Sequence, residues 1–158
     1  MFSFPNPVNE KAARVVAGVV MAVSLVALAT SAYWLLVPLA YGFWARVLTG
    51  PTLSPLGRLA MDGIAPRLGA PKYVPGPPKR FAQGMGAAFT TAGAVAALGF
   101  GQHQIADGLL VAMVAAAGLE SIVAYCLGCK AFALLMRAGL VPEDVCLECA
   151  DISRRLAG

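Results

Sequence analysis

The sequence predicts an all-α protein: an integral membrane bundle of four transmembrane helices in two helical hairpins, with a short C-terminal helix outside the lipid. Three observations predict this fold class. The chain is 59% hydrophobic and 13% charged, whereas soluble domains average about 25% charged residues. Residues 15–45 and 81–102 carry no charge. The 12 Lys and Arg residues fall into patches between such stretches, which is typical of a membrane protein and argues against a nucleic-acid partner.

The first hairpin is predicted from residues 15–45. One crossing of a hydrocarbon core about 30 Å thick needs roughly 20 residues, so this stretch suits two crossings joined by a tight turn. The turn is expected just before an aromatic pair at 33–34, which gives helices at about 11–30 and 32–48. A cleaved signal peptide over 1–32 is the rival interpretation, but the apolar residues that remained would be too few to span.

Residues 49–80 are predicted to be a proline-rich basic connector, because most of the chain's 11 prolines lie there. Apolar residues recur at helical spacing within 53–64, which favours a short helix in the headgroup layer; a solvated basic linker is the alternative. The run Pro-Gly-Pro-Pro at 75–78 is expected to be non-helical, because proline lacks the amide donor that a helix needs.

The second hairpin is expected to consist of helices at about 81–101 and 105–137. Small residues recur on both helices four positions apart, which would let backbones approach closely in lipid. The same stripes would also permit a homo-oligomer. They comprise Gly84, Ala88, Ala92 and Ala96 on one helix, and Ala112, Ala116, Glu120, Ala124 and Gly128 on the other.

The distribution of charge predicts the orientation. Four crossings would leave every Lys and Arg, including Arg14, Arg80 and Lys130 at the membrane boundary, on the side of both chain ends and the connector. The positive-inside rule therefore predicts a multi-pass protein of the inner (cell) membrane with both termini in the cytoplasm. The whole of 1–158 would form one membrane domain that ends in a cysteine-containing tail, 139–158.

The 4 cysteines form two Cys-x-x-Cys pairs, Cys126/Cys129 and Cys146/Cys149. On a single helix rising 1.5 Å per residue, Cys126 would emerge at the cytoplasmic face, where thiols stay reduced. The spacing of the pairs matches a tetrathiolate zinc site, with an iron–sulfur cluster as the less favoured metal centre. A redox relay is the second interpretation, in which Cys126 and Cys129 exchange and Lys130 favours the thiolate. The third interpretation is that the cysteines are buried or lie at an interface and have no chemical role.

Glu120 is the other candidate, because an acid within a membrane span indicates function. It would relay protons, pair with a basic residue at the inner boundary such as Arg14 or Arg80, or serve as a protonated link between helices. On one continuous helix it would lie 120° from Cys126 and 180° from Cys129 at about 100° per residue, so direct proton exchange with the thiols is not expected.

Several motifs together resemble a bacterial family of small four-helix integral membrane proteins that is catalogued as a domain of unknown function. The most specific elements are Arg-Phe-Ala-Gln at 80–83 and Cys-Leu-Gly-Cys at 126–129; Gly-Arg-Leu at 57–59, Pro-Arg-Leu-Gly at 66–69 and Leu-Glu at 119–120 add to them. Members are often encoded beside thioredoxin-like proteins and sulfurtransferases. The resemblance therefore implies thiol or sulfur handling with a partner of one of these kinds.

Three functions follow from the residues and the resemblance together. The first is a thiol or sulfur relay at the cytoplasmic face, with Cys126 and Cys129 as the exchanging pair. The second is a non-enzymatic scaffold or complex subunit whose four cysteines hold zinc. The third is a permeation pathway for a sulfur anion that includes Glu120. The sequence favours a subunit over a stand-alone enzyme; an enzyme here would be a thiol–disulfide oxidoreductase.

Overall fold

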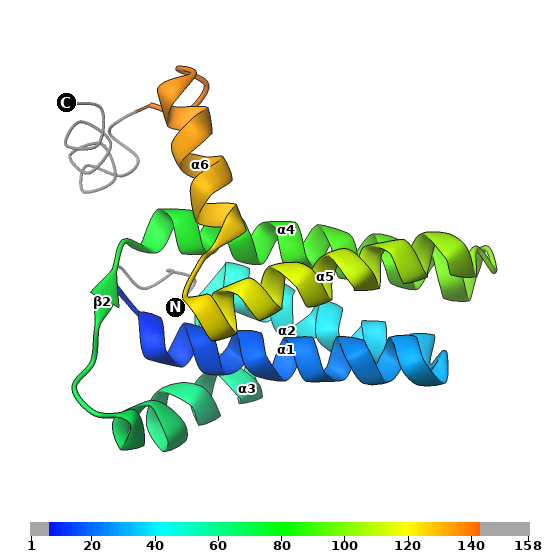
Figure 1. Cartoon of the computed structure of the whole chain (residues 1–158), viewed down its shortest axis with the longest axis horizontal. Helices are drawn as coiled ribbons and strands as arrows, with labels where there is room; N and C mark the ends of the chain where they lie inside the picture. Colours follow the sequence, from blue (N-terminus) through cyan, green and yellow to red (C-terminus); the bar gives the residue numbers. More distant parts are fainter. Residues whose placement is uncertain (1–6, 143–158) are drawn as a thin grey trace.

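The computed structural model describes residues 7–142, and this part of the chain is almost entirely helical, which confirms the all-α prediction (Figure 1). Four long helices run side by side, and a fifth, α6, leaves the bundle near one end. Their bounds are α1 (Glu10–Thr30), α2 (Leu36–Thr49), α4 (Gly76–Ala94), α5 (His103–Val123) and α6 (Leu127–Arg137).

The first two helices are joined by a short polar turn, as predicted. α1 begins after Asn9, whose side chain accepts a hydrogen bond from the Lys11 N–H at 3.0 Å, and ends at Ser31 in the left-handed conformation. A 3₁₀ turn, η1 (Tyr33–Leu35), then precedes α2. The α-helical part of the second segment is therefore 14 residues long.

The connector contains a short helical segment, as the apolar spacing predicts. It consists of α3 (Pro55–Arg58), the π-helical turn η2 (Leu59–Ile64) and the 3₁₀ turn η3 (Ala65–Leu68). The strands β1 (Val8–Asn9) and β2 (Tyr73–Val74) pair antiparallel and hold the end of the connector against the start of α1.

The prediction that 75–78 is non-helical is wrong. α4 begins at Gly76, so Pro77 and Pro78 lie in its first turn. The amides of a first helical turn have no partner within the helix, so proline costs no hydrogen bond there and its fixed φ suits the helix. α4 continues into the π-helical turn η4 (Val95–Gly99) before the loop to α5.

The helices pack across the predicted hairpins rather than only within them. α1 packs mainly against α5 and α2 against α4, each pair antiparallel, whereas α1 and α2 touch little (Figure 1). The small-residue stripe predicted on α4 does not coincide with the buried face of this helix, because two of its four residues, Ala88 and Ala92, are exposed. Buried positions of α4 include Gly86, Ala87, Thr90 and Gly93. A Cβ at Gly86 would clash with the Phe43 ring.

The predicted single helix 105–137 is divided. α5 ends at Val123, Ala124 adopts a left-handed conformation with φ 59°, and α6 starts at Leu127. An apolar sequence is compatible with a helix but does not require one. Here Arg14 donates hydrogen bonds to the carbonyl oxygens of Ser121 and Ile122, which satisfies the end of α5.

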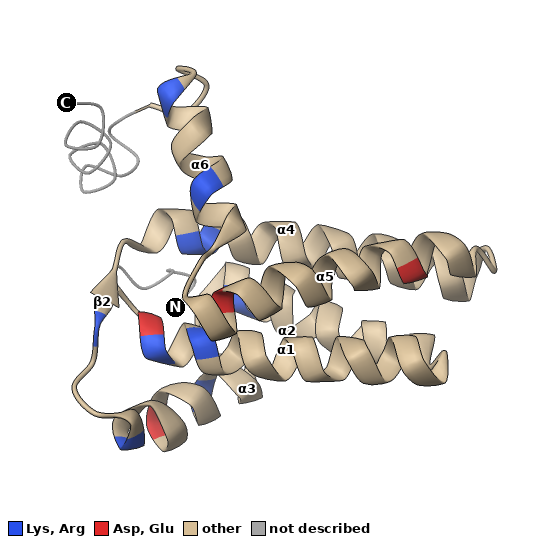
Figure 2. Ribbon diagram, viewed as in Figure 1, with Lys and Arg blue, Asp and Glu red and all other residues tan. Residues whose placement is uncertain are grey.

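The outer surface and the charge distribution indicate a membrane protein. Three helical segments are long and apolar enough to cross a bilayer: Glu10–Thr30, Gly76–Gly99 and His103–Val123. Large apolar side chains such as Leu25, Trp44 and Val111 are exposed around the bundle. Figure 2 shows every Lys and Arg of the described residues at the end of the bundle that carries α6 and the connector. Asp107, near the start of α5, accepts a hydrogen bond from the Tyr33 hydroxyl at 2.9 Å.

Candidate functional site: a cysteine pair at the α5–α6 break

The break between α5 and α6 turns Cys126 into the N-cap of α6. Its Sγ accepts a hydrogen bond from the backbone N–H of Cys129 at 3.3 Å. Both residues are free thiols, with Cys126 buried at 9% exposure and Cys129 half-buried. A sulfur at this position lies at the positive end of the helix dipole, which favours a negatively charged thiolate.

The two thiols differ in acidity. The hydrogen bond from the Cys129 thiol lowers the pKa of Cys126; burial and Glu120 oppose this shift, whereas Lys79 and the Cys129 amide add to it. The same thiol–thiol hydrogen bond raises the pKa of Cys129 well above its usual range, and burial acts in the same direction. When the pair loses one proton, the thiolate therefore resides on Cys126.

An ion pair lies beside the thiols. Lys79 of α4 and Glu120 of α5 are 2.5 Å apart between Nζ and Oε1, with side-chain exposures of 8% and 15%. Glu120 therefore pairs with a basic residue near the boundary, as one interpretation expected, but the partner is Lys79 rather than Arg14 or Arg80. The expected angular separation of Glu120 from the cysteines also fails, because the break redirects the chain after Val123 and brings Cys126 close enough for Glu120 and Lys79 to affect its pKa.

The other predicted boundary residues have structural contacts. Arg14 holds the end of α5, as described above, and the Arg80 Nε donates to the Val47 carbonyl oxygen at 3.0 Å. The Lys130 ammonium lies 5.5 Å from the centre of the Tyr125 ring and is exposed. Among the described residues, it is therefore Lys79 rather than Lys130 that contributes to the low pKa of Cys126.

Close packing between α6 and α4 holds the pair in place. A Cβ at Gly128, between the two cysteines, would lie 2.4 Å from the Ala82 Cβ and 2.6 Å from its Cα. Glycine is therefore needed at this position for α6 to approach α4. Beyond the cysteines, the Phe132 ring packs 5.8 Å from that of Phe81, which anchors the next turn of α6.

A cavity of about 290 Å³ adjoins the site inside the bundle. Apolar side chains of α1, α4 and α5 form most of its walls, with Phe43 from α2. Its polar lining residues are Gln83, Glu120 and Cys126. Cys126 thus lines a largely apolar cavity and also lies close to the ion pair.

The metal-site prediction concerns residues outside the described part of the chain. Cys146 and Cys149 both lie beyond residue 142, so their relation to the first pair stays a prediction. Within residues 7–142, no group of three or more His, Cys, Asp or Glu side chains is placed to hold a metal ion. A zinc or iron–sulfur site would need the second pair.

Sequence reasoning missed Lys79, because the residues before it were assigned to a non-helical connector. The signal was present: when helix α4 starts at 76, positions 79, 83 and 86 follow one another along one face. Lys79, Gln83 and the buried Gly86 all contribute to cavities on that face.

Comparison with known proteins gives one match. A family model described as Domain of unknown function (DUF4395) matches residues 8–137. No curated protein and no solved structure matches. Because the matched region covers most of the chain and includes both helices of the cysteine site, this protein belongs to the family described as Domain of unknown function (DUF4395).

Proposed function

We propose that this chain is a four-pass membrane protein whose Cys126/Cys129 pair exchanges a disulfide with a partner at the charged end of the bundle. The carrying observation is the placement of Cys126 at the N-cap of α6, with the Cys129 amide on its sulfur and Lys79 nearby. This is the arrangement that stabilises a thiolate.

The four-pass topology is supported by the dimensions of the second segment. η1 and α2 together are about 27 Å long at 1.5 Å per α-helical and 2.0 Å per 3₁₀ residue, close to the thickness of a hydrocarbon core. The charge distribution then assigns the end bearing α6 and the connector to the cytoplasm. The inner (cell) membrane and cytoplasmic termini belong to this proposal.

The direction of exchange follows from exposure and acidity. In the oxidised pair, a thiolate of a partner dithiol would attack the Sγ of Cys129, which is the more exposed sulfur. The Cys126–Cys129 bond breaks and Cys126 leaves as the thiolate, which is favourable because a thiol of low pKa is a good leaving group. The partner's second thiol then attacks the mixed disulfide and releases Cys129. Partner dithiol and chain disulfide thereby become partner disulfide and chain dithiol, with two electrons and two protons transferred.

The partner class comes from the family resemblance: a thioredoxin-like protein or a sulfurtransferase. Cys146 and Cys149 would form the second pair, receiving the electrons from Cys126 and Cys129. The alternative is a scaffold in which all four thiolates hold a structural zinc ion. A path for a sulfur anion is less favoured, because the Glu120 carboxylate lines the central cavity.

Trapping with a thioredoxin-like partner whose resolving cysteine is replaced by serine tests the exchange. The oxidised full-length chain is expected to form a mixed disulfide through Cys129 and to free the Cys126 thiol for alkylation. Cys129→Ser should abolish the adduct, and Lys130→Met should retain it. A purified chain that holds about one zinc ion, with all its thiols protected from alkylation, would overturn exchange in favour of the scaffold.

A further inference from the structure

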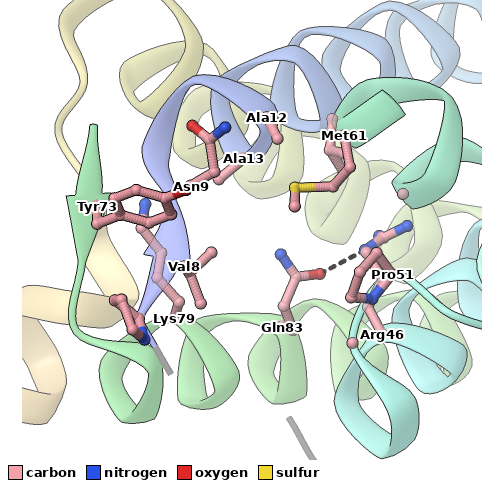
Figure 3. A pocket seen from close by; sticks show the side chains of 14 residues that line it. Val8, Asn9, Ala12, Ala13, Arg46, Pro51, Met61, Tyr73, Lys79 and Gln83 are labelled. Atoms are coloured by element: carbon pink, nitrogen blue, oxygen red, sulfur yellow. Dashed lines mark hydrogen bonds between the residues drawn. The ribbon is translucent and has the colours of Figure 1, made fainter. Parts of the chain in front are cut away.

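A second cavity, of about 90 Å³, lies at the charged end of the bundle between the start of α1, the end of α2, the connector and α4 (Figure 3). Among the described residues that line it, Arg46 and Lys79 are charged and none carries a carboxylate. Figure 3 shows Gln83 projecting from α4 between these two cations. Apart from Lys79, the residues that line this cavity have no part in the proposed thiol exchange.

Arg46 is buried, at 6% exposure, and its hydrogen-bond partners are neutral, although the Glu120 carboxylate, which pairs with Lys79, attracts it electrostatically. Its Nε donates to Gln83 Oε1 at 2.8 Å, one terminal nitrogen donates to Ser54 Oγ at 3.2 Å, and the guanidinium carbon lies 4.7 Å from the centre of the Phe43 ring. Within residues 7–142, the ion pairs are Lys72–Glu10 and Lys79–Glu120, so no carboxylate pairs with Arg46. A buried cation is costly without a counter-charge, and the guanidinium retains donors for one.

Gln83 adds an oriented neutral donor. Because its Oε1 accepts from Arg46, its amide nitrogen is turned away from that bond, and no hydrogen bond from this nitrogen is found in the described part of the chain. Gln83 lines both cavities, as do Ala13 and Val16. The cationic cavity of 90 Å³ therefore adjoins the apolar cavity of 290 Å³ across these shared residues.

The geometry points to a binding site for an anionic phospholipid, with its phosphate at Arg46 and Gln83 and an acyl chain in the apolar cavity. Glu120 pairs with Lys79, so the group Arg46, Lys79 and Glu120 keeps one net positive charge, which the charge of a phosphate complements. The adjoining apolar walls suit a hydrocarbon chain. Anionic lipids are recognised by basic pockets at the cytoplasmic ends of membrane helices. A free phosphate would use the same head site but would gain nothing from the apolar cavity.

Lipid binding to the full-length chain, delipidated in a neutral detergent, tests this site. The probes are dioleoyl phosphatidylglycerol, dioleoyl phosphatidylcholine and inorganic phosphate, with bound molecules counted by native mass spectrometry. The anionic lipid is expected to bind most tightly. Arg46→Gln should weaken its binding about 10- to 100-fold, the effect of losing a hydrogen bond to a charged group. Arg80→Gln removes the same charge outside both cavities and should change affinity less than about twofold.

A cavity-filling pair tests the chain site without altering any charge. Ala116 lines the apolar cavity, whereas its neighbour Ala115 faces outward. Ala116→Phe should abolish lipid binding and Ala115→Phe should retain it. This comparison tests whether an acyl chain occupies the apolar cavity, even if Arg46→Gln fails to fold.

Two outcomes would overturn the proposal. If inorganic phosphate bound as tightly as the lipid and Ala116→Phe had no effect, the site would bind a free anion. An equal loss of lipid affinity in Arg46→Gln and Arg80→Gln would also overturn the proposal, because Arg80 lies outside both cavities. Cys129→Ser removes a sulfur that lines neither cavity and should leave lipid binding intact, so failure of lipid binding is separate from failure of the thiol exchange.

Discussion

The buried ion pair between Lys79 of α4 and Glu120 of α5 spans 2.5 Å and lies beside the Cys126 thiol. The two charges act on the thiol in opposite directions: Lys79 lowers the pKa of Cys126 and Glu120 raises it. The ion pair therefore contributes to the pKa of Cys126, after the larger effect of the Cys129 thiol, in addition to joining two helices.

Substitutions in this ion pair should shift the acidity of Cys126 in opposite directions. Lys79→Met removes the cation, so the pKa of Cys126 should rise and its alkylation should need higher pH. Glu120→Gln removes the anion, so the pKa should fall and alkylation should begin at lower pH. Alkylation rates of Cys126 from about pH 5 to 10, in a chain with the other cysteines replaced by alanine, give both midpoints. Replacing Cys129 removes the largest cause of the lowered pKa of Cys126, but it does so in every variant. The midpoints of the Lys79 and Glu120 variants can therefore still be compared.

Lys130→Met is the matched control for this series, because Lys130 is exposed and follows Cys129 directly in sequence. Its midpoint should equal that of the parent chain. Each substitution in the ion pair should also destabilise the bundle by about 3–5 kcal/mol, the usual cost of leaving one buried charge alone. A larger midpoint shift in Lys130→Met than in Lys79→Met would contradict the assignment.

Ala124→Gly should stabilise the protein. The φ of 59° at Ala124 is a left-handed conformation that costs a residue with a Cβ about 1–2 kcal/mol and costs glycine almost nothing. After allowance for the greater freedom of glycine in the unfolded chain, a net gain of about 1 kcal/mol is expected. Unfolding curves in one detergent measure it. Ala115→Gly, in the middle of α5, should instead lose about 1 kcal/mol. Equal effects at both positions would mean that the helix is not broken at Ala124.

The sequence predicted the helical class, the turn near 31–32 and the placement of basic residues at one end, because each depends on composition or charge over many residues. It did not predict the break before Cys126. The apolar stretch runs through this point without glycine or proline, and the small-residue spacing from Glu120 to Gly128 continues in phase. The break depends on contacts with distant residues: Arg14 at the end of α5 and Ala82 beneath Gly128.

The candidate site was predicted only in part, also because contacts between residues distant in the sequence complete it. The spacing of Cys126 and Cys129 identified the pair, and the cost of an acid in a membrane identified Glu120. The partner of Glu120 could not be deduced from one helix, because it comes from α4, 41 positions earlier in the chain. Arg46 was likewise hidden, since nothing in its local sequence distinguishes a buried arginine from one that faces the headgroups.

Gly128→Ala should displace α6 from α4. The added methyl group would overlap the Ala82 backbone, which cannot move aside as a flexible side chain would. Overpacking of this kind costs about 1–3 kcal/mol, and α6 should respond by moving outward and exposing Cys126 to alkylation. Gly84→Ala is the control on α4, because a Cβ there meets nothing within 4 Å, and it should be neutral or slightly stabilising. Unchanged alkylation of Cys126 in a stable Gly128→Ala variant would show that the contact does not position the pair.

The proposed four-pass topology predicts which loops share a side of the membrane. Single cysteines at Ser31 and Gln102, in a chain without its own cysteines, should react with a membrane-impermeant maleimide added to intact cells. Cysteines at Ala70 and Leu140 should react only after permeabilisation, because the basic end of the bundle would be cytoplasmic. Val111→Cys, on the apolar outer surface of α5, should be unreactive in both cases because it would face lipid. If α2 did not cross, Ser31 and Ala70 would react from the same side, and the start of α1 would lie on the opposite face of the bilayer from the basic connector and the cysteine pair.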